Sequence, residues 1–508
     1  MDKHFNLIDE PWLPVAGKDR VSLRQVFSDP ELPALGGNPV EKIALMKLLL
    51  AIAQAAATPE DDAAWRAMGA DGMARKCLAY LDQWHDRFDL YGERPFLQMP
   101  AIAKAKIKSY GTVLPEIATG NTTILTHGQV ERSLSDAEKA VLLVCLMGFA
   151  LGGKQADNTI VLSRGYVGKC KNGKPAKNSQ PGPSVASRGL LHTCFQGENV
   201  CQTVWLNLLT EERITQNARF PAGLGTAPWE QMPVGEDDEV ARKLKSSVMG
   251  RLVPLCRFSL LAEAGLHYSD GVAHTNYKDG MCDPTVAVNW SGKEPKALWT
   301  DPEKRPWREL TALLGFLAQQ QIGGFECWQL TACLSRACES VDAFAIWSAG
   351  LRVSNDMGEQ RTKGNDDFVE SCVALQSSAL GSFWFSNLQT EMDALGDLHD
   401  GLSRSVKKFF RRETPGDKDD RLGEATSKVA TQLFWQLCER DFQTLIYACG
   451  SDGDSATINS DARHRLRRRF ADYAQQAYDR YCPKDTARQL DAWARCRPNH
   501  SKYLQPEA

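Results

Sequence analysis

The sequence contains no hydrophobic run long enough for a membrane helix and no large excess of charge of one sign. Its most apolar stretch, residues 140–153, is shorter than the roughly 20 residues that span a bilayer. The opening residues include Asp2, Asp9 and Glu10 and lack the apolar core of a signal peptide, so we expect a cytoplasmic protein. Lys and Arg number 60 against 63 Asp and Glu, and the resulting net charge of −3 excludes a protein that is basic throughout.

Cysteines at metal-ligand spacing are also missing. The chain has 15 cysteines, but no two of them form a CxxC motif. The densest group, Cys327, Cys333 and Cys338, would place its thiols on different faces of a helix. We therefore expect free thiols in a reducing compartment and no metal site.

Familiar catalytic motifs are absent as well, including GxSxG and HExxH. Residues 148–155 (GFALGGKQ) nearly match the phosphate-binding loop GxxxxGK[ST]. However, Gln155 replaces the hydroxyl residue, and the segment follows a predicted helix where that loop follows a strand. Two dipeptides, His85-Asp86 and His399-Asp400, have no recognisable partner ligands. We expect no enzymatic activity and no cofactor, and a metal-dependent HD-type phosphohydrolase or nuclease is the alternative.

The most unusual segment that is present is basic. Residues 158–197 contain no Asp or Glu and are rich in Gly, Pro, Ser and Asn. Their cations before residue 189 are Arg164, Lys169, Lys171, Lys174, Lys177 and Arg188. This pattern predicts a loop or hairpin that contacts phosphate backbones, and a solvated surface loop is the alternative.

Hydrophobic periodicity predicts two kinds of architecture along the 508 residues. Residues 39–57 form a helix, residues 133–136 cap an apolar helix that runs to 151, short strand-like runs such as 204–209 dominate the middle of the chain, and a helix is expected over 328–348. Nearly everything after residue 367 is helical, with segments at 368–398, 402–412, 422–449, 461–481 and 486–497. We expect an α+β protein. A mixed α/β N-terminal domain (1–360) precedes a C-terminal helical bundle of the four-helix type (361–508).

The predicted bundle carries two basic helix faces. One contains Arg404, Lys407, Lys408, Arg411 and Arg412, with no acidic residue between 401 and 412. The other run contains Arg463, Arg465, Arg467, Arg468 and Arg469. Such faces fit a track for phosphates or an acidic partner, although a solvated helix face is the usual origin of a charge run.

Three motifs resemble one protein family. Residues 5–15, FNLIDEPWLPV, resemble the opening signature of the CasA family, the large subunit of the type I-E CRISPR surveillance complex called Cascade. The segments PVE at 39–41 and RPFLQ at 94–98 are similar to further elements of that family and occur in the same order. The likeness extends over essentially the whole chain, and the first motif is its most specific part.

The resemblance implies a non-catalytic subunit with a mixed α/β N-terminal domain and a C-terminal four-helix bundle. Such a subunit recognises the protospacer-adjacent motif in duplex DNA, helps to open the target for crRNA pairing, and recruits a helicase-nuclease. The implied partners are the backbone, small and crRNA-end subunits of the crRNA-bound complex, the target double-stranded DNA and that helicase-nuclease, with no membrane. A purely structural scaffold subunit is a further alternative.

The resemblance also assigns roles to particular residues. Gly152, Gly153 and Lys154 match the family's glycine loop, and Lys278 is the expected minor-groove lysine, with Lys293 as its rival. Close backbone approach and a cationic donor suit the minor groove.

A second set of assignments covers the strand-opening wedge and the guide. Arg352, Ser354 and Asn355 are expected to contact DNA. Arg352 ends the Gly-x-Arg segment that precedes the wedge, and Asn355 in the wedge stands in place of the glutamine of some relatives. Residues of the loop expected near the guide RNA are Asn121, Thr122 and Ile124. The remaining expected DNA contacts, Lys169, Lys171, Lys407, Lys408 and Arg411, come from the basic loop and the bundle.

Overall fold

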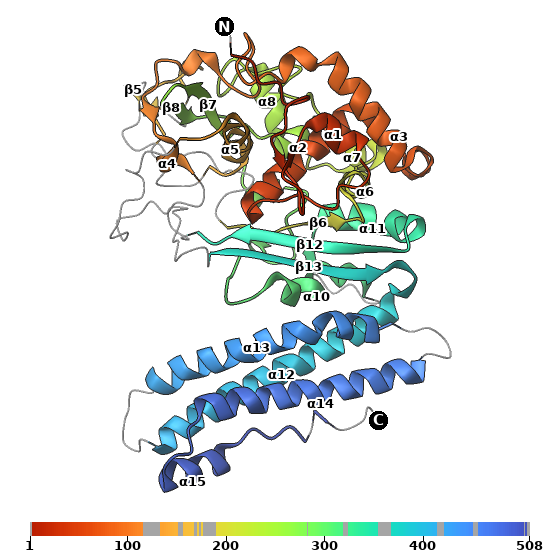
Figure 1. Ribbon diagram of the computed structural model, residues 1–508, viewed down its shortest axis with the longest axis vertical. Helices are drawn as coiled ribbons and strands as arrows, with labels where there is room; N and C mark the ends of the chain where they lie inside the picture. The colour runs from red at the N-terminus through yellow and green to blue at the C-terminus, as the bar shows by residue number, and fades with distance from the viewer. Residues whose placement is uncertain are drawn as a thin grey trace. The chain divides into compact units, whose positions relative to one another are not determined.

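The computed structural model is drawn in Figure 1. It describes residues 3–114, 133–150, 156–166, 170–171, 174–175, 189–281, 283–318, 324–353, 367–413, 421–450, 456–501 and 503–504. The chain divides into two compact units, one made of residues 1–309 and 322–372 and the other of 310–321 and 373–508. The domain boundary predicted between 360 and 361 lies outside the described residues. Helices and small sheets mix in the first unit and long helices make up most of the second, so the predicted α+β class is confirmed.

Helix α2 (Pro39–Ala57) lies at the centre of the N-terminal unit. Asn38 begins it with a capping box, because its side chain accepts a hydrogen bond from Glu41 N while the Glu41 carboxylate accepts one from Asn38 N. The helix is apolar on almost every face and packs against α3, α5, α6, α9 and β12. Lys47 and Gln54 are nevertheless buried in it.

The N-terminal unit contains further helices. The longer ones are α1 (Leu23–Ser28), α3 (Asp62–Gln83), α5 (Asp136–Gly148), α6 (Val200–Leu206), α7 (Glu211–Gln216), α8 (Glu239–Lys245) and α11 (Trp328–Ser340). Single turns are α4 (Tyr110–Val113), α9 (Met249–Leu252), η1 (His85–Arg87), η2 (Pro100–Ile102), η4 (Tyr277–Asp279) and η5 (Pro306–Glu309). The strand-like interpretation of 204–209 is wrong. Asn199 caps α6, and Trp205 on this helix stacks on Trp65 of α3 with ring centroids 4.0 Å apart.

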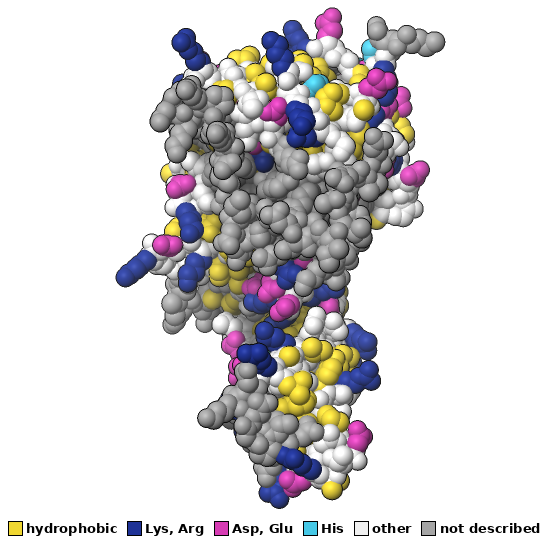
Figure 2. All heavy atoms as spheres, turned by 90° about the vertical axis from the view of Figure 1, so that its left-hand side faces the viewer, with side chains coloured by type: hydrophobic (Ala, Val, Ile, Leu, Met, Phe, Trp, Pro, Cys, Tyr) yellow, Lys and Arg dark blue, Asp and Glu magenta, His cyan; other side chains and the backbone are white. Residues whose placement is uncertain are grey.

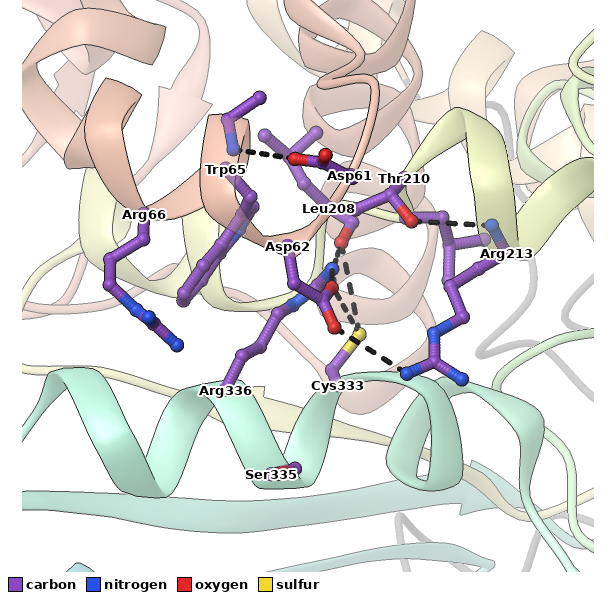
Figure 3. A network of polar contacts seen from close by, with 12 residues as sticks. Asp61, Asp62, Trp65, Arg66, Leu208, Thr210, Arg213, Cys333, Ser335 and Arg336 are labelled. Carbon is purple, nitrogen blue, oxygen red and sulfur yellow. Dashed lines mark hydrogen bonds and ion pairs between the residues drawn. The ribbon is translucent and has the colours of Figure 1, made fainter.

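A buried arginine holds α11 against the start of α3 (Figure 3). The Arg336 guanidinium lies 3.0 Å from a carboxylate oxygen of Asp62, donates to the carbonyl of Leu208, and lies 4.6 Å from the ring centroid of Trp65. The side chain of Arg336 is only 2% exposed. This network contains none of the residues assigned to nucleic acid, so a substitution in it should affect structure and stability only.

The strands among the described residues form five small sheets. Two are hairpins, β1 (Leu13–Pro14) with β2 (Arg20–Val21) and β4 (Cys170–Lys171) with β5 (Lys174–Pro175). The three-stranded sheets have the orders β3 (Ile107–Lys108), β8 (Gly265–Asp270), β7 (Arg257–Ala262); β10 (Lys296–Ala297), β9 (Val288–Asn289), β11 (Phe325–Glu326); and β13 (Phe368–Gln376), β12 (Ala343–Leu351), β6 (His192–Gln196).

The segment expected to be helical over 368–398 is divided between a strand and a helix. Strand β13 occupies its first part, where Val369, Val373 and Leu375 are buried at alternate positions. Helix α12 begins only at Ser382, after the turn η7 (Ser377–Ala379). The period-two alternation is present in the sequence, but the helical character of the residues that follow conceals it.

The C-terminal unit is a bundle of long helices. They are α12 (Ser382–Glu413), α13 (Arg421–Ala448), α14 (Ala456–Tyr481) and α15 (Ala487–Cys496), and the short α10 (Leu310–Leu313) and η6 (Gly315–Leu317) pack against α12. Helix α12 packs on each of the other three long helices, and it is continuous where two helices were expected. The predicted helical bundle is confirmed. No helix in the described parts of the chain is long and apolar enough to cross a bilayer.

Candidate nucleic-acid interface

Most residues assigned to DNA or guide RNA lie outside the described residues. These are Asn121, Thr122, Ile124, Gly152, Gly153, Lys154, Lys169, Ser354 and Asn355. The structure does describe the residues at which each of these segments leaves and rejoins the fold. We refer to those flanking residues as anchors, and their positions show which segments start or end near one another.

The guide-proximal loop and the glycine loop share one anchor cluster. Leu114 and Leu134 flank residues 115–132, and both are buried in a cluster built on Leu142 and Tyr268. Ala156, which follows the glycine loop at 151–155, packs against the same cluster. The two loops therefore meet the body of the N-terminal unit at a common place.

The other end of the glycine loop is anchored at the start of β6. Helix α5 ends at Gly148, earlier than the predicted 151, and Phe149 caps it with a backbone hydrogen bond to Cys145 O. The Phe149 ring lies 6.3 Å from the ring of His192, the first residue of β6. The glycine loop thus begins beside the strand that follows the last cation of the basic segment.

The basic segment and the predicted wedge also have adjacent anchors. Gly189 follows the last cation of the basic segment, Arg188, and has a φ of +73°. A Cβ atom there would lie 3.0 Å from Leu351 O and 3.4 Å from Val353 N, directly before the wedge segment at 354–366. Only a residue without a side chain fits this conformation and this close approach. The end of one expected DNA-contacting segment therefore touches the start of another.

Lys278 lies in the same region on the single turn η4. Its side chain is 54% exposed and its Nζ atom is 3.6 Å from a carboxylate oxygen of Glu294. Tyr277, next to it, makes an edge-to-face contact with Trp299, with ring centroids 6.4 Å apart, and Trp299 pairs with Leu190 in an isolated β-bridge. The Tyr277–Trp299 contact therefore connects the turn that carries Lys278 to Leu190, which follows Gly189. The rival Lys293 is also exposed.

Arg352 is engaged within the fold. Its Nε and Nη2 atoms lie 3.1 and 2.9 Å from one carboxylate oxygen of Asp367, whose side chain is buried. The backbone N of Arg352 also donates to Asp367 O, at 2.8 Å. This pair closes the base of the segment 354–366, so the Arg352 guanidinium holds the ends of the predicted wedge together. Its assignment to DNA stays a prediction.

A buried polar network lies beneath these anchors. The Lys47 ammonium forms an ion pair with Asp283, and the other Asp283 oxygen accepts hydrogen bonds from Thr285 N at 3.0 Å and Thr285 Oγ1 at 2.7 Å. Thr285 Oγ1 lies 2.8 Å from Nδ1 of His192. Although burial opposes it, the charge of Lys47 keeps the pKa of Asp283 below its usual value. Sequence reasoning did not find this network, because Lys47 and Asp283 lie 236 positions apart along the chain.

The basic faces of the bundle are only partly available to a ligand. Arg404, Lys408, Arg411, Arg465 and Arg468 are exposed, and Lys407 is half-buried. Figure 2 shows Lys and Arg side chains on this unit around a patch of hydrophobic side chains. Three of the cations counted in the sequence are paired with acids of the bundle. Arg463 and Arg467 contact the buried Glu391, and Arg469 lies 2.6 Å from Asp441.

Lys171 and the two His-Asp dipeptides give no indication of a ligand or a reaction. Lys171 lies in the β4–β5 hairpin, opposite Lys174. The dipeptide histidines use nearby acids, since His85 Nε2 is 2.6 Å from Asp9 and His399 Nδ1 is 3.0 Å from Asp400. Within the described ranges, no group of three or more His, Cys, Asp or Glu side chains could hold a metal ion.

The contact between the two anchors gives a first prediction. A Cβ atom at Gly350 would collide with the Thr300 hydroxyl and lie 3.0 Å from Leu190 O. We expect Gly350→Ala to lower the free energy of unfolding by about 1–3 kcal/mol, because the packed neighbours must move. Urea unfolding measures this, with Gly396→Ala as the control. Gly396 lies inside α12 with open space at its Cβ position, so that substitution should raise stability by about 0.5–1 kcal/mol. Equal effects of the two variants would contradict the close approach.

Comparisons with known proteins agree with this architecture. The family model described as CRISPR-associated protein Cse1 matches residues 6–477. The CRISPR-associated protein CasA/Cse1 of Thermus thermophilus is 29% identical over 340 residues, which cover 61% of this chain and 60% of that protein. The aligned part is therefore less than two thirds of that relative's length.

Solved structures extend the likeness over the whole fold. The crystal structure of Thermus thermophilus CasA superimposes with a TM-score of 0.71 at 22% identity and 99% coverage of both chains. That of Thermobifida fusca Cse1 gives 0.74 at 20% identity, covering 99% of this chain and 97% of the other. A chain of a structure described as a CRISPR RNA-guided surveillance complex gives 0.67 at 16% identity, covering 99% and 100%.

Proposed function

The chain belongs to the CRISPR-associated Cse1 (CasA) family, and we propose on that premise that it is the large subunit of a type I-E CRISPR RNA-guided surveillance complex. In this role it has no active site of its own. Its partners are the other crRNA-bound subunits, the target double-stranded DNA and a recruited helicase-nuclease. The similarity to a chain of a surveillance complex supports the fold that this role requires.

The proposed role of the N-terminal unit is to read the protospacer-adjacent motif and to start opening the duplex. The observation that carries this proposal is the clustering of anchors, because four segments expected at nucleic acid meet the fold within one region. Lys154 and Lys278 would contact the motif from the minor groove, where a close backbone and a cationic donor suit the degenerate pattern of base edges. Ser354 and Asn355 would form the wedge, above the closed pair of Arg352 and Asp367.

The bundle has a separate proposed role. Its exposed cations Arg404, Lys408 and Arg411, together with the half-buried Lys407, would guide the displaced strand through phosphate contacts. Because Arg463 and Arg467 are turned toward Glu391, the α14 run would contribute mainly through Arg465 and Arg468. Phosphate contacts of this kind weaken as salt rises.

Single lysine substitutions test motif contact. We expect Lys154→Ala and Lys278→Ala each to weaken binding of a duplex with the correct motif about tenfold, which is about 1.4 kcal/mol. The assay uses the reconstituted guide-bound complex. Lys243→Ala is the matched control, since Lys243 is an exposed lysine on α8 that pairs with Glu239 at 2.9 Å. Unchanged affinity of both variants at moderate salt would remove these assignments.

Omitting the chain tests the role as a whole. The complex with and without it is titrated with duplexes that carry the correct or a scrambled motif, at two salt concentrations. We expect motif-dependent binding that weakens with salt only when the chain is present. If the chain joins the complex but leaves affinity and motif preference unchanged, it is a structural scaffold. Cleavage of DNA by the purified chain with Mn²⁺, abolished by His399→Ala, would instead support a nuclease.

A further inference from the structure

The loop that carries Lys278 is exposed in its middle and held at both ends by buried cations. At one end, Arg251 donates through Nη1 to Thr275 O at 3.4 Å and through Nη2 to Thr275 Oγ1 at 3.3 Å. At the other end, Lys47 forms its ion pair with Asp283. The Lys47 ammonium also donates to the carbonyl of Arg251, at 3.3 Å, which joins the two attachments.

These cations occupy an unfavourable environment. Lys47 is 5% exposed in a helix that is otherwise almost entirely apolar, and Arg251 is 1% exposed. Desolvating an ammonium or guanidinium costs several kcal/mol, and well-packed apolar residues in place of both Lys47 and Asp283 would often serve stability as well or better. Stability alone therefore gives no reason for an ion pair at this position, whereas attachment of a loop does.

The loop has weak internal structure of its own. Lys278 lies on one 3₁₀ turn, capped by Asn276, and its side chain contacts Glu294 at 3.6 Å. An isolated turn of this kind is not stable by itself. If the ends of the loop were free, ordering it would reduce the affinity for any ligand that Lys278 contacts.

We propose that Lys47 and Arg251 are positioning residues that hold residues 275–281 and Asp283 so that Lys278 faces the motif duplex. The inference rests on the proposed function, because it assumes that Lys278 contacts DNA. It adds that two residues without access to DNA determine how strongly the motif is recognised. Lys47 acts through Asp283, and Arg251 acts through Thr275.

Lys47→Met tests this inference, because methionine nearly preserves volume and removes the charge. In the reconstituted complex we expect about tenfold weaker binding to the correct motif, with binding to a scrambled motif unchanged. The double variant Lys47→Met/Lys278→Ala should bind no more weakly than Lys278→Ala alone. Both substitutions remove the same contact, that between Lys278 and DNA. Hydrogen exchange at residues 275–281 should become faster.

Two further variants separate positioning from stability. Lys47→Met alone leaves the Asp283 carboxylate buried without its cation, so Tm falls. Lys47→Met/Asp283→Asn removes that charge and keeps an oxygen for Thr285, so most of the Tm should return while the tenfold binding defect persists. Arg336→Met is the control for loss of a buried cation elsewhere in the unit (Figure 3). It should lower Tm without changing motif preference or exchange at 275–281.

The possible results distinguish this inference from the function on which it rests. If Lys278→Ala weakens binding but Lys47→Met does not, the inference is wrong and the proposed function stands. Recovery of affinity together with Tm in Lys47→Met/Asp283→Asn would also overturn it, since the role of Lys47 would then be structural. If Lys278→Ala has no effect, the assignment of Lys278 to DNA fails, and the positioning role fails with it.

Discussion

Replacing Glu391 by alanine is expected to lower the free energy of unfolding of the C-terminal unit by about 3–5 kcal/mol. Glu391 is 1% exposed on α12, and the Arg467 guanidinium binds it with contacts of 2.7, 3.0 and 3.1 Å. Arg463 adds a contact at 3.6 Å. The substitution would leave two arginines of α14 facing a buried site without a carboxylate, and such a charge costs far more than an exposed one.

The matched control is an ion pair of the same unit at the surface. Arg495 lies 2.6 Å from Asp491 on α15, and both side chains are at least half exposed. Arg495→Ala should change stability by less than about 0.5 kcal/mol. Urea unfolding of the full chain measures both variants, and hydrogen exchange on α12 and α14 assigns the change to the bundle. Similar effects of the two variants would contradict the account of Glu391.

Local signals were sufficient for several of the helices. Ser135 caps α5 as predicted, because its hydroxyl accepts from Glu138 N and the Glu138 carboxylate accepts from Ser135 N. Helix α2 has the predicted bounds, with Asn38 and Pro39 at its start. Helices α13 and α15 match their predicted segments to within about one residue. In α2 and α5, hydrogen bonds between side chains and backbone within four residues fix where the helix begins, so the sequence alone predicts that start.

The errors arose where tertiary pairing decides the conformation. The run 204–209 has strand-forming residues, yet Trp205 lies on α6, and its ring stacks on Trp65, far away in sequence. The helix predicted over 328–348 ends at Ser340, and strand β12 follows it. The register of β12 with β6, such as Trp347 opposite Cys194, joins distant segments. Propensity is weak evidence in such cases.

The sequence predicted which segments belong to the candidate site, but not which of them lie close together in space. Motif resemblance supplied Lys154, Lys278 and the wedge residues, and it could not show that Gly189 touches Leu351. The partner of Lys47 could not be identified either, because Asp283 lies 236 positions away along the chain. A buried cation predicts only that some carboxylate must be near.

The second large effect that we expect is a loss of stability in mild acid. His192 and His274 are both buried in the N-terminal unit. Burial and the Lys47 ammonium lower the pKa of His192 to about 3, and burial and the Arg251 guanidinium lower the pKa of His274 to about 3. Nδ1 of His192 lies 2.8 Å from Thr285 Oγ1, and Nε2 of His274 lies 2.7 Å from Pro254 O. Neither hydrogen-bond partner is an acidic group that would favour the charged ring.

Because both folded-state pKa values lie below the unfolded value of about 6.5, the unfolded chain takes up protons first as pH falls. The stability contributed by each neutral histidine is complete above about pH 6.5 and is lost progressively from there toward pH 3. Each histidine should therefore lower the free energy of unfolding by about 2 kcal/mol between about pH 7 and about pH 5, and the pair by about 4 kcal/mol.

Urea unfolding across this range measures how the free energy of unfolding changes with pH. His192→Gln should reduce this change by about half. Stability that stays level down to about pH 4 would show that neither histidine is held neutral by the fold.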